Sequence, residues 1–251
     1  MIYVLVPWRH QIGRNLDARD CVVRHYEHTF PDSVVRLCDD PEPGPFNRGR
    51  ALNAGVVESH TQPGDVLVFA DADLIVPTAN LESAVRAVTE PGVASYVIPF
   101  DSILMTDDVS AARLTTLSKI AGPTVDLNID LSGDTFDRLS TGGVNVMLRS
   151  SFDQAGGFDP RFAGWGFEDA AFEQAALTLV GPPSWITGRA VHLWHPSTRR
   201  PDTPEHEASL ALCRRYEVAS GNRVLMSQLI AEYKPKRRAA DLARFKRETG
   251  S

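Results

Sequence analysis

Residues 66–73 read Val-Leu-Val-Phe-Ala-Asp-Ala-Asp, an apolar run that stops on two carboxylates. A short apolar run with branched and aromatic side chains is typical of a strand inside a sheet. In open α/β sheets, ligands bind just beyond the carboxyl ends of the strands. Asp71 and Asp73 therefore stand where two carboxylates can hold a divalent cation such as Mg²⁺ or Mn²⁺. The alternative, two solvated aspartates in a turn, is the commoner case for an isolated triplet of this kind.

Strand-like and helix-like patterns alternate on both sides of this stretch. Further strands are expected at 2–6 and 33–38, and helices at 17–30, 48–60 and 81–88. This alternation predicts an α/β fold with a doubly wound, mixed and mostly parallel sheet of the Rossmann-like kind. The chain becomes polar and helical in pattern after Pro196. We therefore expect a main domain at residues 1–196 and a helical, basic C-terminal extension at residues 197–251.

The overall composition is ordinary for a globular protein, but the charge is unevenly distributed. Of the 251 residues, 43% are apolar and 23% are charged, and the formal net charge is −6. That charge argues against a protein that grips polyanions with its whole surface. Residues 234–247, however, are rich in Lys and Arg and contain Asp241 as their single acid. A solvated helix face explains such a run, and contact with an anionic acceptor such as nucleic acid is the alternative.

The cysteines and the apolar segments bear on location. Cys21, Cys38 and Cys213 are far apart and show neither metal-binding nor disulfide spacing. We expect free thiols in a reducing, cytoplasmic compartment. The apolar run at residues 2–6 is only strand-sized, and no apolar segment reaches the length of a membrane span. We therefore expect neither a signal peptide nor association with a membrane.

A pair of histidines follows the strand-like residues 190–191. His192 and His195 are three positions apart and are followed by Pro196. Imidazole is the commonest neutral metal ligand, and it favours Mn²⁺ over Mg²⁺. Side chains three apart point to opposite faces of a strand, so both can reach one ion only if the strand ends between them. A structural role is the alternative for either histidine, and we rank His195 above His192 as a ligand.

An aromatic side chain stands beside two further carboxylates in Gly164-Trp165-Gly166-Phe167-Glu168-Asp169. The two acids precede a helix-like pattern, so Asp169 could serve simply as a helix cap. A tryptophan between two glycines is harder to explain by packing. Proteins bind sugars with an aromatic ring against the C–H face and with hydrogen bonds to the hydroxyls. A carboxylate held at such a place can also act as general base on a hydroxyl.

Five short blocks occur in order along the chain. They are Pro7-Trp8-Arg9, then Phe-Asn-Arg-Gly-Arg-Ala-Leu-Asn at 46–53, Phe-Ala-Asp-Ala-Asp-Leu-Ile at 69–75, Gly142-Gly143-Val144 with Gly156-Gly157-Phe158 downstream, and the segment 164–169. In this order the blocks resemble the β-1,4-galactosyltransferases and their relatives with the same C-terminal galactosyltransferase region. The resemblance covers roughly residues 1–196. It implies a glycosyltransferase domain of the GT-A type.

The resemblance also implies a role for each matching position. Asp169 would be the catalytic base. Trp165 and Glu168 would bind the acceptor or the donor sugar. Asp73 and His195 would bind the metal, and His192 is the further candidate ligand. The donor site would comprise Pro7, Arg9, Asp40, Phe46, Arg48, Asp71, Ala72 and Gly143. Asp40 is included on the general pattern of GT-A domains, where an acid after the second strand contacts uracil or ribose.

These positions together predict an inverting transferase. It would use Mn²⁺, with Mg²⁺ as the second choice, and a UDP-sugar donor, and it would deliver the sugar to an acceptor hydroxyl of a glycan, protein, small molecule or modified nucleic acid. Phe167 departs from the family pattern, which has glycine there, and should narrow the sugar site. The alternatives are a retaining transferase resembling the polypeptide N-acetylgalactosaminyltransferases, a nucleotidyltransferase, and a sugar-binding module without catalysis. The donor sugar and the acceptor do not carry over from the resemblance.

Overall fold

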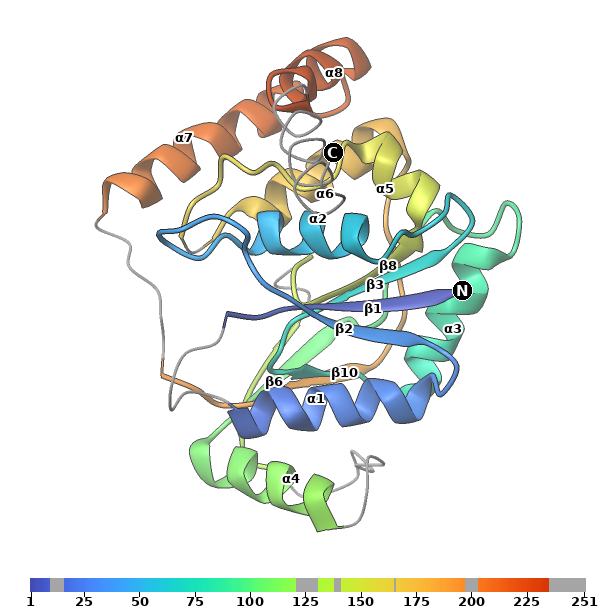
Figure 1. Ribbon diagram of the computed structural model, residues 1–251, viewed down its shortest axis with the longest axis vertical. Coiled ribbons are helices and arrows are strands. Elements are labelled where there is room, and N and C mark those ends of the chain that lie inside the picture. The colour runs from blue at the N-terminus through green and yellow to red at the C-terminus, as the bar shows by residue number, and fades with distance from the viewer. Residues whose placement is uncertain (10–15, 121–130, 138–140, 165, 197–202, 235–251) are drawn as a thin grey trace, which may run out of the picture.

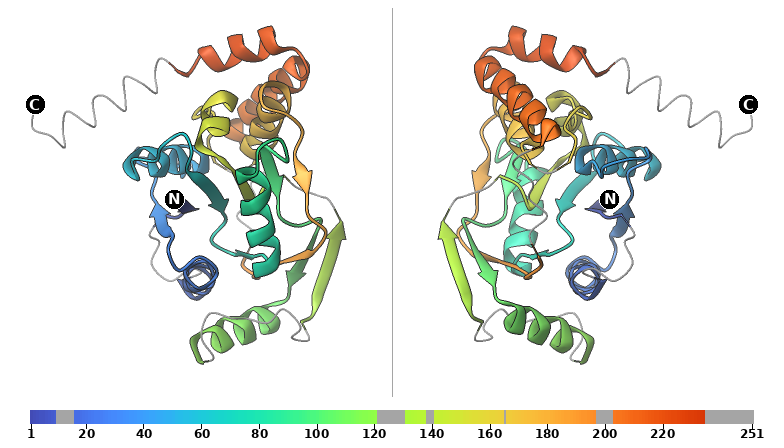
Figure 2. Two further views of the ribbon diagram at one scale, coloured as in Figure 1. Left: turned by 90° about the vertical axis from the view of Figure 1, so that its right-hand side faces the viewer. Right: turned by 90° about the vertical axis from the view of Figure 1, so that its left-hand side faces the viewer.

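The fold contains two β-sheets surrounded by helices (Figures 1 and 2). The computed structural model describes residues 1–9, 16–120, 131–137, 141–164, 166–196 and 203–234. The larger sheet has, in spatial order, strands β2 (Val34–Cys38), β1 (Ile2–Pro7), β3 (Val66–Ala70), β8 (Val144–Leu148), β5 (Tyr96–Ile98) and β9 (Ser184–Trp185). The smaller sheet has strands β4 (Leu74–Ile75), β10 (Arg189–His192), β6 (Ser102–Thr106) and β7 (Gly133–Asp137).

Helices cover both faces of the larger sheet. The helices of the described residues, of which α7 and α8 pack against α6 and α4 packs against α1, are α1 (Leu16–Thr29), α2 (Arg48–Glu58), α3 (Thr78–Thr89), α4 (Asp108–Ile120), α5 (Arg149–Ala155), α6 (Glu168–Leu179), α7 (Pro204–Ala219) and α8 (Arg223–Ala231). Figure 1 shows α2, α5 and α6 on one face and α1 and α3 on the other. Figure 2 shows α4 at the end of the molecule opposite α7 and α8. Within the described part of the chain, none of the helices is both long and apolar enough to span a bilayer.

The larger sheet is mixed, which confirms the predicted α/β class with helices on both faces. β1 pairs with β2 and with β3 in parallel, whereas β8 runs antiparallel to both β3 and β5. All five residues of β3 are buried because this central strand is covered on both faces. Since β1, β2 and β3 run in the same direction, their carboxyl ends meet at one edge of the sheet. That edge is where the strand-end carboxylates lie.

Buried apolar side chains form two separate clusters. The first surrounds the larger sheet. The second lies between the helices α6, α7 and α8, and its buried members are Phe162, Ala171, Ala175, Leu179, Cys213, Tyr216, Ala219, Met226, Leu229, Ile230 and Tyr233. The helices after Pro196 therefore share an apolar core with α6, the helix that begins at Glu168. The division at residue 196 stays a prediction, but any boundary there cuts through this second cluster.

Candidate functional site

Two strand ends bring one carboxylate and two imidazoles together. β10 ends at His192 and pairs antiparallel with β4, where His192 lies opposite Leu74. The backbone N–H of Leu193 donates to the carbonyl oxygen of Asp73 at 2.7 Å. Asp73 Oδ2 lies 3.1 Å from His195 Nε2, and Asp73 Oδ1 lies 3.7 Å from His192 Nε2. One ligand atom of each residue can be chosen so that all three atoms lie within 4.8 Å of one another.

The end of β10 explains how both histidines reach Asp73. A continuous strand would send their side chains to opposite faces, but regular pairing stops at His192. Thr106 on β6 holds the following turn: its hydroxyl donates to the carbonyl oxygen of His192 at 2.9 Å and accepts from the N–H of Trp194 at 3.0 Å. This is the geometry that the sequence requires if both side chains are to meet one ion.

The local electrostatics suit the binding of a cation. Burial alone would raise the pKa of Asp73, but the hydrogen bond from His195 and the nearby positive charges, including those of His195 and Arg48, outweigh it and lower that pKa below its ordinary value. Burial lowers the pKa of His192, so this imidazole is neutral and has a free electron pair. The hydrogen bond to Asp73 raises the pKa of His195. An ionised carboxylate beside a neutral imidazole is a suitable pair of ligands.

One buried arginine connects the strand-end aspartate to the start of α6. Arg48 Nε donates to Asp71 Oδ1 at 2.7 Å, and Arg48 Nη1 donates to Asp169 Oδ1 at 2.5 Å. Glu168 Oε1 lies 3.9 Å from the same nitrogen. The Arg48 side chain is 12% exposed and its guanidinium lies over the ring of Phe158. Three acids, one just after β3 and two at the start of α6, therefore surround a single cation, which orients the two carboxylates that it contacts directly.

Burial distinguishes Glu168 from its neighbours. Desolvation, and then the charge of Asp169, raise the pKa of Glu168 to about 8. Asp71 is affected less: burial and Asp169 raise its pKa to about 6, and Arg48 opposes them. Near neutral pH, Glu168 is therefore protonated and can donate a hydrogen bond as well as accept one. Such a group is suited to holding a sugar hydroxyl.

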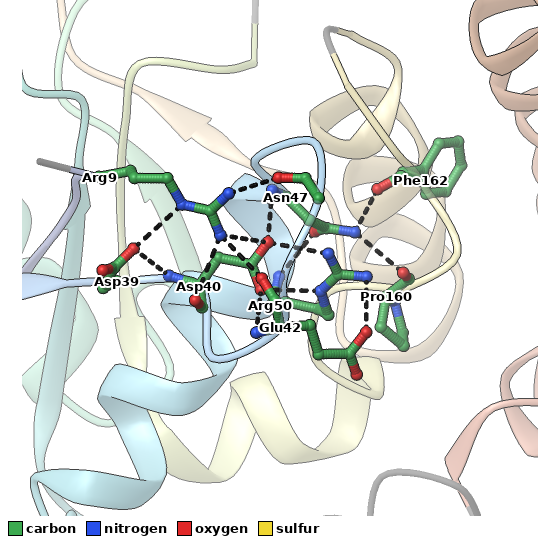
Figure 3. A network of polar contacts seen from close by, with 9 residues as sticks. Arg9, Asp39, Asp40, Glu42, Asn47, Arg50, Pro160 and Phe162 are labelled. Atoms are coloured by element: carbon green, nitrogen blue, oxygen red, sulfur yellow. Dashed lines mark hydrogen bonds and ion pairs between the residues drawn. The ribbon is translucent and has the colours of Figure 1, made fainter. Parts of the chain in front are cut away.

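A second polar group lies at the ends of β1 and β2, in the loop between β2 and α2 (Figure 3). The side chain of Asp40 is fully buried and accepts from Arg50 Nε and Nη2 at 2.9 and 2.8 Å. It also accepts from the backbone N–H groups of Glu42 and Asn47 at 3.2 and 2.8 Å. These bonds outweigh burial and lower the pKa of Asp40. In this conformation the acceptor oxygens of Asp40 are used by the loop itself, and a contact from Asp40 to a nucleotide stays a prediction.

Arg9 and Phe46 enclose the same loop. Arg9 donates to the carbonyl oxygens of Gly44 at 2.6 Å and Glu42 at 2.9 Å, and its guanidinium lies 5.4 Å from the centre of the Phe46 ring. An aromatic ring beside a guanidinium at the carboxyl edge of a sheet can accommodate a flat base and an anionic group. Pro7 ends β1 beside Cys38. The predicted nucleotide residues thus form a group at the same edge as Asp71.

Gly143 is hydrogen-bonded to Asp71 at the carboxyl edge of the larger sheet. The backbone N–H of Asp71 donates to the carbonyl oxygen of Gly143 at 2.8 Å. Gly143 has a φ of +89°, and a Cβ atom there would lie 2.5 Å from Leu74 Cδ2. Glycine is therefore required by both the backbone conformation and the close approach of Leu74. Ala72 lies partly buried between the two aspartates.

The structure brings most of the predicted site residues to one edge of the molecule. The side chains form two groups, one of Arg48 with Asp71, Glu168 and Asp169 and one of Asp73 with His192 and His195, and Asp71 and Asp73 are two residues apart at the end of β3. Trp165 lies outside the described residues, as does the basic run after Lys234, so their predicted contacts stay predictions. Sequence reasoning missed Arg50. The helix dipole favours acidic side chains in the first turn of a helix, and Arg50 is basic. A basic side chain at this place implies an acidic partner, and this pattern could have identified Arg50.

One segment of the chain is similar to a known protein family. A family model described as the N-terminal domain of galactosyltransferase matches residues 132–184, which include β7, β8, α5 and α6. This segment is therefore similar to galactosyltransferases. Human chondroitin sulfate synthase 3 is 24% identical over 194 residues, which cover 77% of this chain and 20% of that protein. The mouse chondroitin sulfate synthase 3 is 25% identical over 177 residues. The chain spans about a fifth of the length of the curated relatives that it matches.

Solved structures of two transferases are also similar to this chain. A mutant of Drosophila β-1,4-galactosyltransferase 7, in complex with manganese, UDP-Gal and xylobiose, is 15% identical with a TM-score of 0.49. The match covers 83% of this chain and 78% of that one. Glucosyl-3-phosphoglycerate synthase from Mycobacterium tuberculosis, in complex with Mg²⁺ and UDP, is 13% identical with a TM-score of 0.44. That match covers 87% of this chain and 78% of the other.

Proposed function

We propose that the protein is a metal-dependent glycosyltransferase of the GT-A type. It would transfer a sugar from a UDP-sugar to an acceptor hydroxyl with inversion at the anomeric carbon. The observation that carries this proposal is the arrangement at the sheet edge. Arg48 pairs with both Asp71 and Asp169, and the ligand set of Asp73, His192 and His195 includes the residue two positions after Asp71. A protein that only binds sugar needs neither a metal site nor an oriented carboxylate.

The residues present fit a divalent metal. One carboxylate oxygen and two imidazole nitrogens can lie within 4.8 Å of one another. Mixed nitrogen and oxygen ligands favour Mn²⁺, because Mg²⁺ prefers oxygen ligands alone. His192 Nδ1 is buried and has no hydrogen-bond partner among the residues that the structure describes. When bound, the metal would neutralise negative charge on the diphosphate leaving group.

The chain's own residues account for the proton and the orientation. Asp169 would take the proton of the acceptor hydroxyl while the new bond to the anomeric carbon forms and the bond to the diphosphate breaks. Arg48 donates to Asp169, which fixes the orientation of that carboxylate. Glu168, protonated near neutral pH, would donate a hydrogen bond to a sugar hydroxyl. Arg9 and Phe46 would hold the nucleotide at the ends of β1 and β2.

The similar proteins guide the choice of substrates to test. The Drosophila transferase was crystallised with UDP-Gal and xylobiose, and the Mycobacterium enzyme with UDP. We therefore propose a UDP-hexose as donor and a sugar hydroxyl as acceptor. Binding of an anionic acceptor through the basic run after Lys234 remains an open alternative.

The test begins with the binding of UDP to the full chain by calorimetry, with Mn²⁺, with Mg²⁺ and with EDTA. We expect binding that depends on the metal and is tighter with Mn²⁺. A panel of UDP-sugars with xylobiose is then assayed for released UDP, and NMR gives the anomeric configuration of any product. Retention of configuration would favour the alternative resembling the polypeptide N-acetylgalactosaminyltransferases. Binding of UDP without release from any donor would favour the sugar-binding module, and metal-independent binding would contradict the proposed metal site.

A further inference from the structure

The segment that delivers the two acids to the site is supported by the C-terminal helices. We call residues 159–167 the acceptor-side segment, of which Trp165 lies outside the described residues. It leads directly into Glu168 and Asp169 at the start of α6. Both acids depend on where this segment ends, because their backbone positions follow from it. What holds the segment therefore affects the orientation of the proposed base.

One face of α7 follows the acceptor-side segment along its length. The rings of His206 and Phe167 lie 5.1 Å apart, at the start of the helix. One turn later, the hydroxyl of Ser209 donates to the carbonyl oxygen of Ala163 at 3.5 Å. Further along, the hydroxyl of Tyr216 donates to Asp159 Oδ2 at 2.9 Å. Positions 206, 209 and 216 share a face of the helix with the buried Cys213, since their spacing is three, four and three.

Phe167 holds a backbone conformation that needs this support. Its φ is +72°, in the left-handed region that residues with a Cβ atom rarely occupy. Such a conformation persists where the surrounding structure imposes it. The Phe167 side chain packs against the second apolar cluster, and its carbonyl oxygen accepts from the N–H of Ala171 at 2.9 Å. The ring of Phe167 thus ties the end of the segment to the core that α7 completes.

The donor side holds the same segment from the opposite direction. Asn47 lies fully buried just before α2, and its Nδ2 donates to the carbonyl oxygens of Pro160 and Phe162 (Figure 3). The Asn47 Oδ1 atom caps α2 by accepting from the N–H of Arg50. The acceptor-side segment is therefore fixed between the helix that carries Arg48 and the helix that follows Pro196.

We propose that α7 is part of the working site, and that His206 and Phe167 are positioning residues for Glu168 and Asp169. This inference rests on the proposed function, because it assigns to Asp169 the role of base. It means that the proposed acceptor side is incomplete without a helix that begins 35 residues after Asp169. Where the family pattern has glycine, this chain has Phe167, whose ring lies against His206 of α7.

The test compares three variants of the full chain. His206→Ala removes the ring against Phe167, His206→Phe restores an aromatic ring, and Glu207→Ala changes an exposed neighbour in the same helical turn. Three quantities are measured: the Kd of UDP with Mn²⁺, the turnover of UDP-galactose with xylobiose or water as acceptor, and the hydrogen exchange of the Ala171 amide and the amides around it.

We expect His206→Ala to keep the UDP Kd within about twofold and to lose about tenfold in turnover, because a small misplacement of a reacting group is costly. Exchange at Ala171 should accelerate, His206→Phe should recover most of the turnover, and Glu207→Ala should match the parent. Unchanged turnover and exchange in His206→Ala would overturn the inference, as would a parallel loss of UDP binding. A parent chain that neither binds UDP nor turns over the donor would refute the proposed function instead, while the exchange rates would still show whether α7 holds the segment.

Discussion

The metal side and the acceptor side of the site are built by different kinds of contact. Asp73 and His192 are placed by backbone hydrogen bonds, since β4 and β10 pair directly beside them. Glu168 and Asp169 are placed by a segment that side chains of α2 and α7 hold. Strand pairing fixes positions through many short, regular bonds, whereas the acceptor side depends on a few tertiary contacts between distant parts of the chain. The acceptor side should therefore vary more readily between related chains.

Arg48 is the point where the two sides meet. It is the first residue of α2, and it contacts Asp71 at the strand end and Asp169 at the start of α6. Removing a ligand on the metal side should abolish donor binding. Removing the base should spare donor binding and stop transfer. Removing the arginine should disturb both sides and the stability of the fold.

The largest effect is expected on the metal side, from Asp73→Ala. This change removes the carboxylate that both histidines approach. Metal-supported UDP binding should fall below detection by calorimetry, because two imidazoles alone hold the cation poorly. Asp17→Asn, an exposed change on α1, serves as the control and should bind like the parent. Normal Mn²⁺-dependent UDP affinity in Asp73→Ala would mean that the metal, if any, binds elsewhere.

On the acceptor side, Asp169→Asn separates a base from a carboxylate that only accepts a hydrogen bond from Arg48. The amide oxygen of asparagine can still accept that hydrogen bond, but asparagine cannot take the proton of a hydroxyl. We expect UDP and Mn²⁺ to bind as in the parent, and turnover to fall by about 10² to 10⁴. The measurement is steady-state release of UDP with saturating donor. If Asp169→Asn transfers sugar near the parental rate, another group is the base and the inverting assignment loses its main support.

Arg48→Met should lower stability on both sides at once. It leaves Asp71, Glu168 and Asp169 close together without their shared cation. Leaving buried acids unpaired should lower the free energy of unfolding by about 3 kcal/mol, measured by urea unfolding. Arg36→Met is the matched control, because the Arg36–Glu58 pair lies at the surface and should contribute about 0–1 kcal/mol. Equal losses in the two variants would show that the buried arrangement adds nothing.

The same comparison explains what could be predicted from the sequence. The grouping of Asp73 with His192 and His195 could be predicted because an apolar strand followed by Asp71 and Asp73 is a local pattern, and because the two histidines come at the end of a strand; that the group binds a metal stays a prediction. The first three strands and the helices between them lie within two residues of their expected bounds. Parallel pairing and a carboxyl edge follow from the alternation of strands and helices. These features depend on short stretches of chain.

Features that depend on distant contacts were not predicted. The smaller sheet joins β4 and β10, which are more than a hundred residues apart, and nothing local in either indicates the pairing. The contact between Phe167 and His206 was not predicted either. We expected Phe167 to narrow the sugar site, whereas in the structure its ring lies against His206 of α7. Arg48 was expected to contact the donor, and in this structure its guanidinium joins Asp71 and Asp169. Charge pairs of this kind are specified by the fold as a whole.

The smallest predicted effect concerns the pH dependence of stability through Glu168. Burial and Asp169 raise the pKa of Glu168 to about 8 in the folded protein, from an ordinary value of 4.5. Between these pH values the folded state holds a proton that the unfolded state has released. Stability from this group is therefore full below pH 4.5 and is lost as the pH rises towards 8.

Glutamine cannot titrate, so Glu168→Gln should show a smaller fall in Tm between pH 5 and pH 8 in the presence of EDTA. A slope remains in both proteins, because burial also raises the pKa of Asp71. Glu82→Gln, an exposed change on α3, should keep the parental slope. Identical slopes in the parent and Glu168→Gln would show that Glu168 is ionised in the fold, and it would then hold a sugar hydroxyl only as an acceptor.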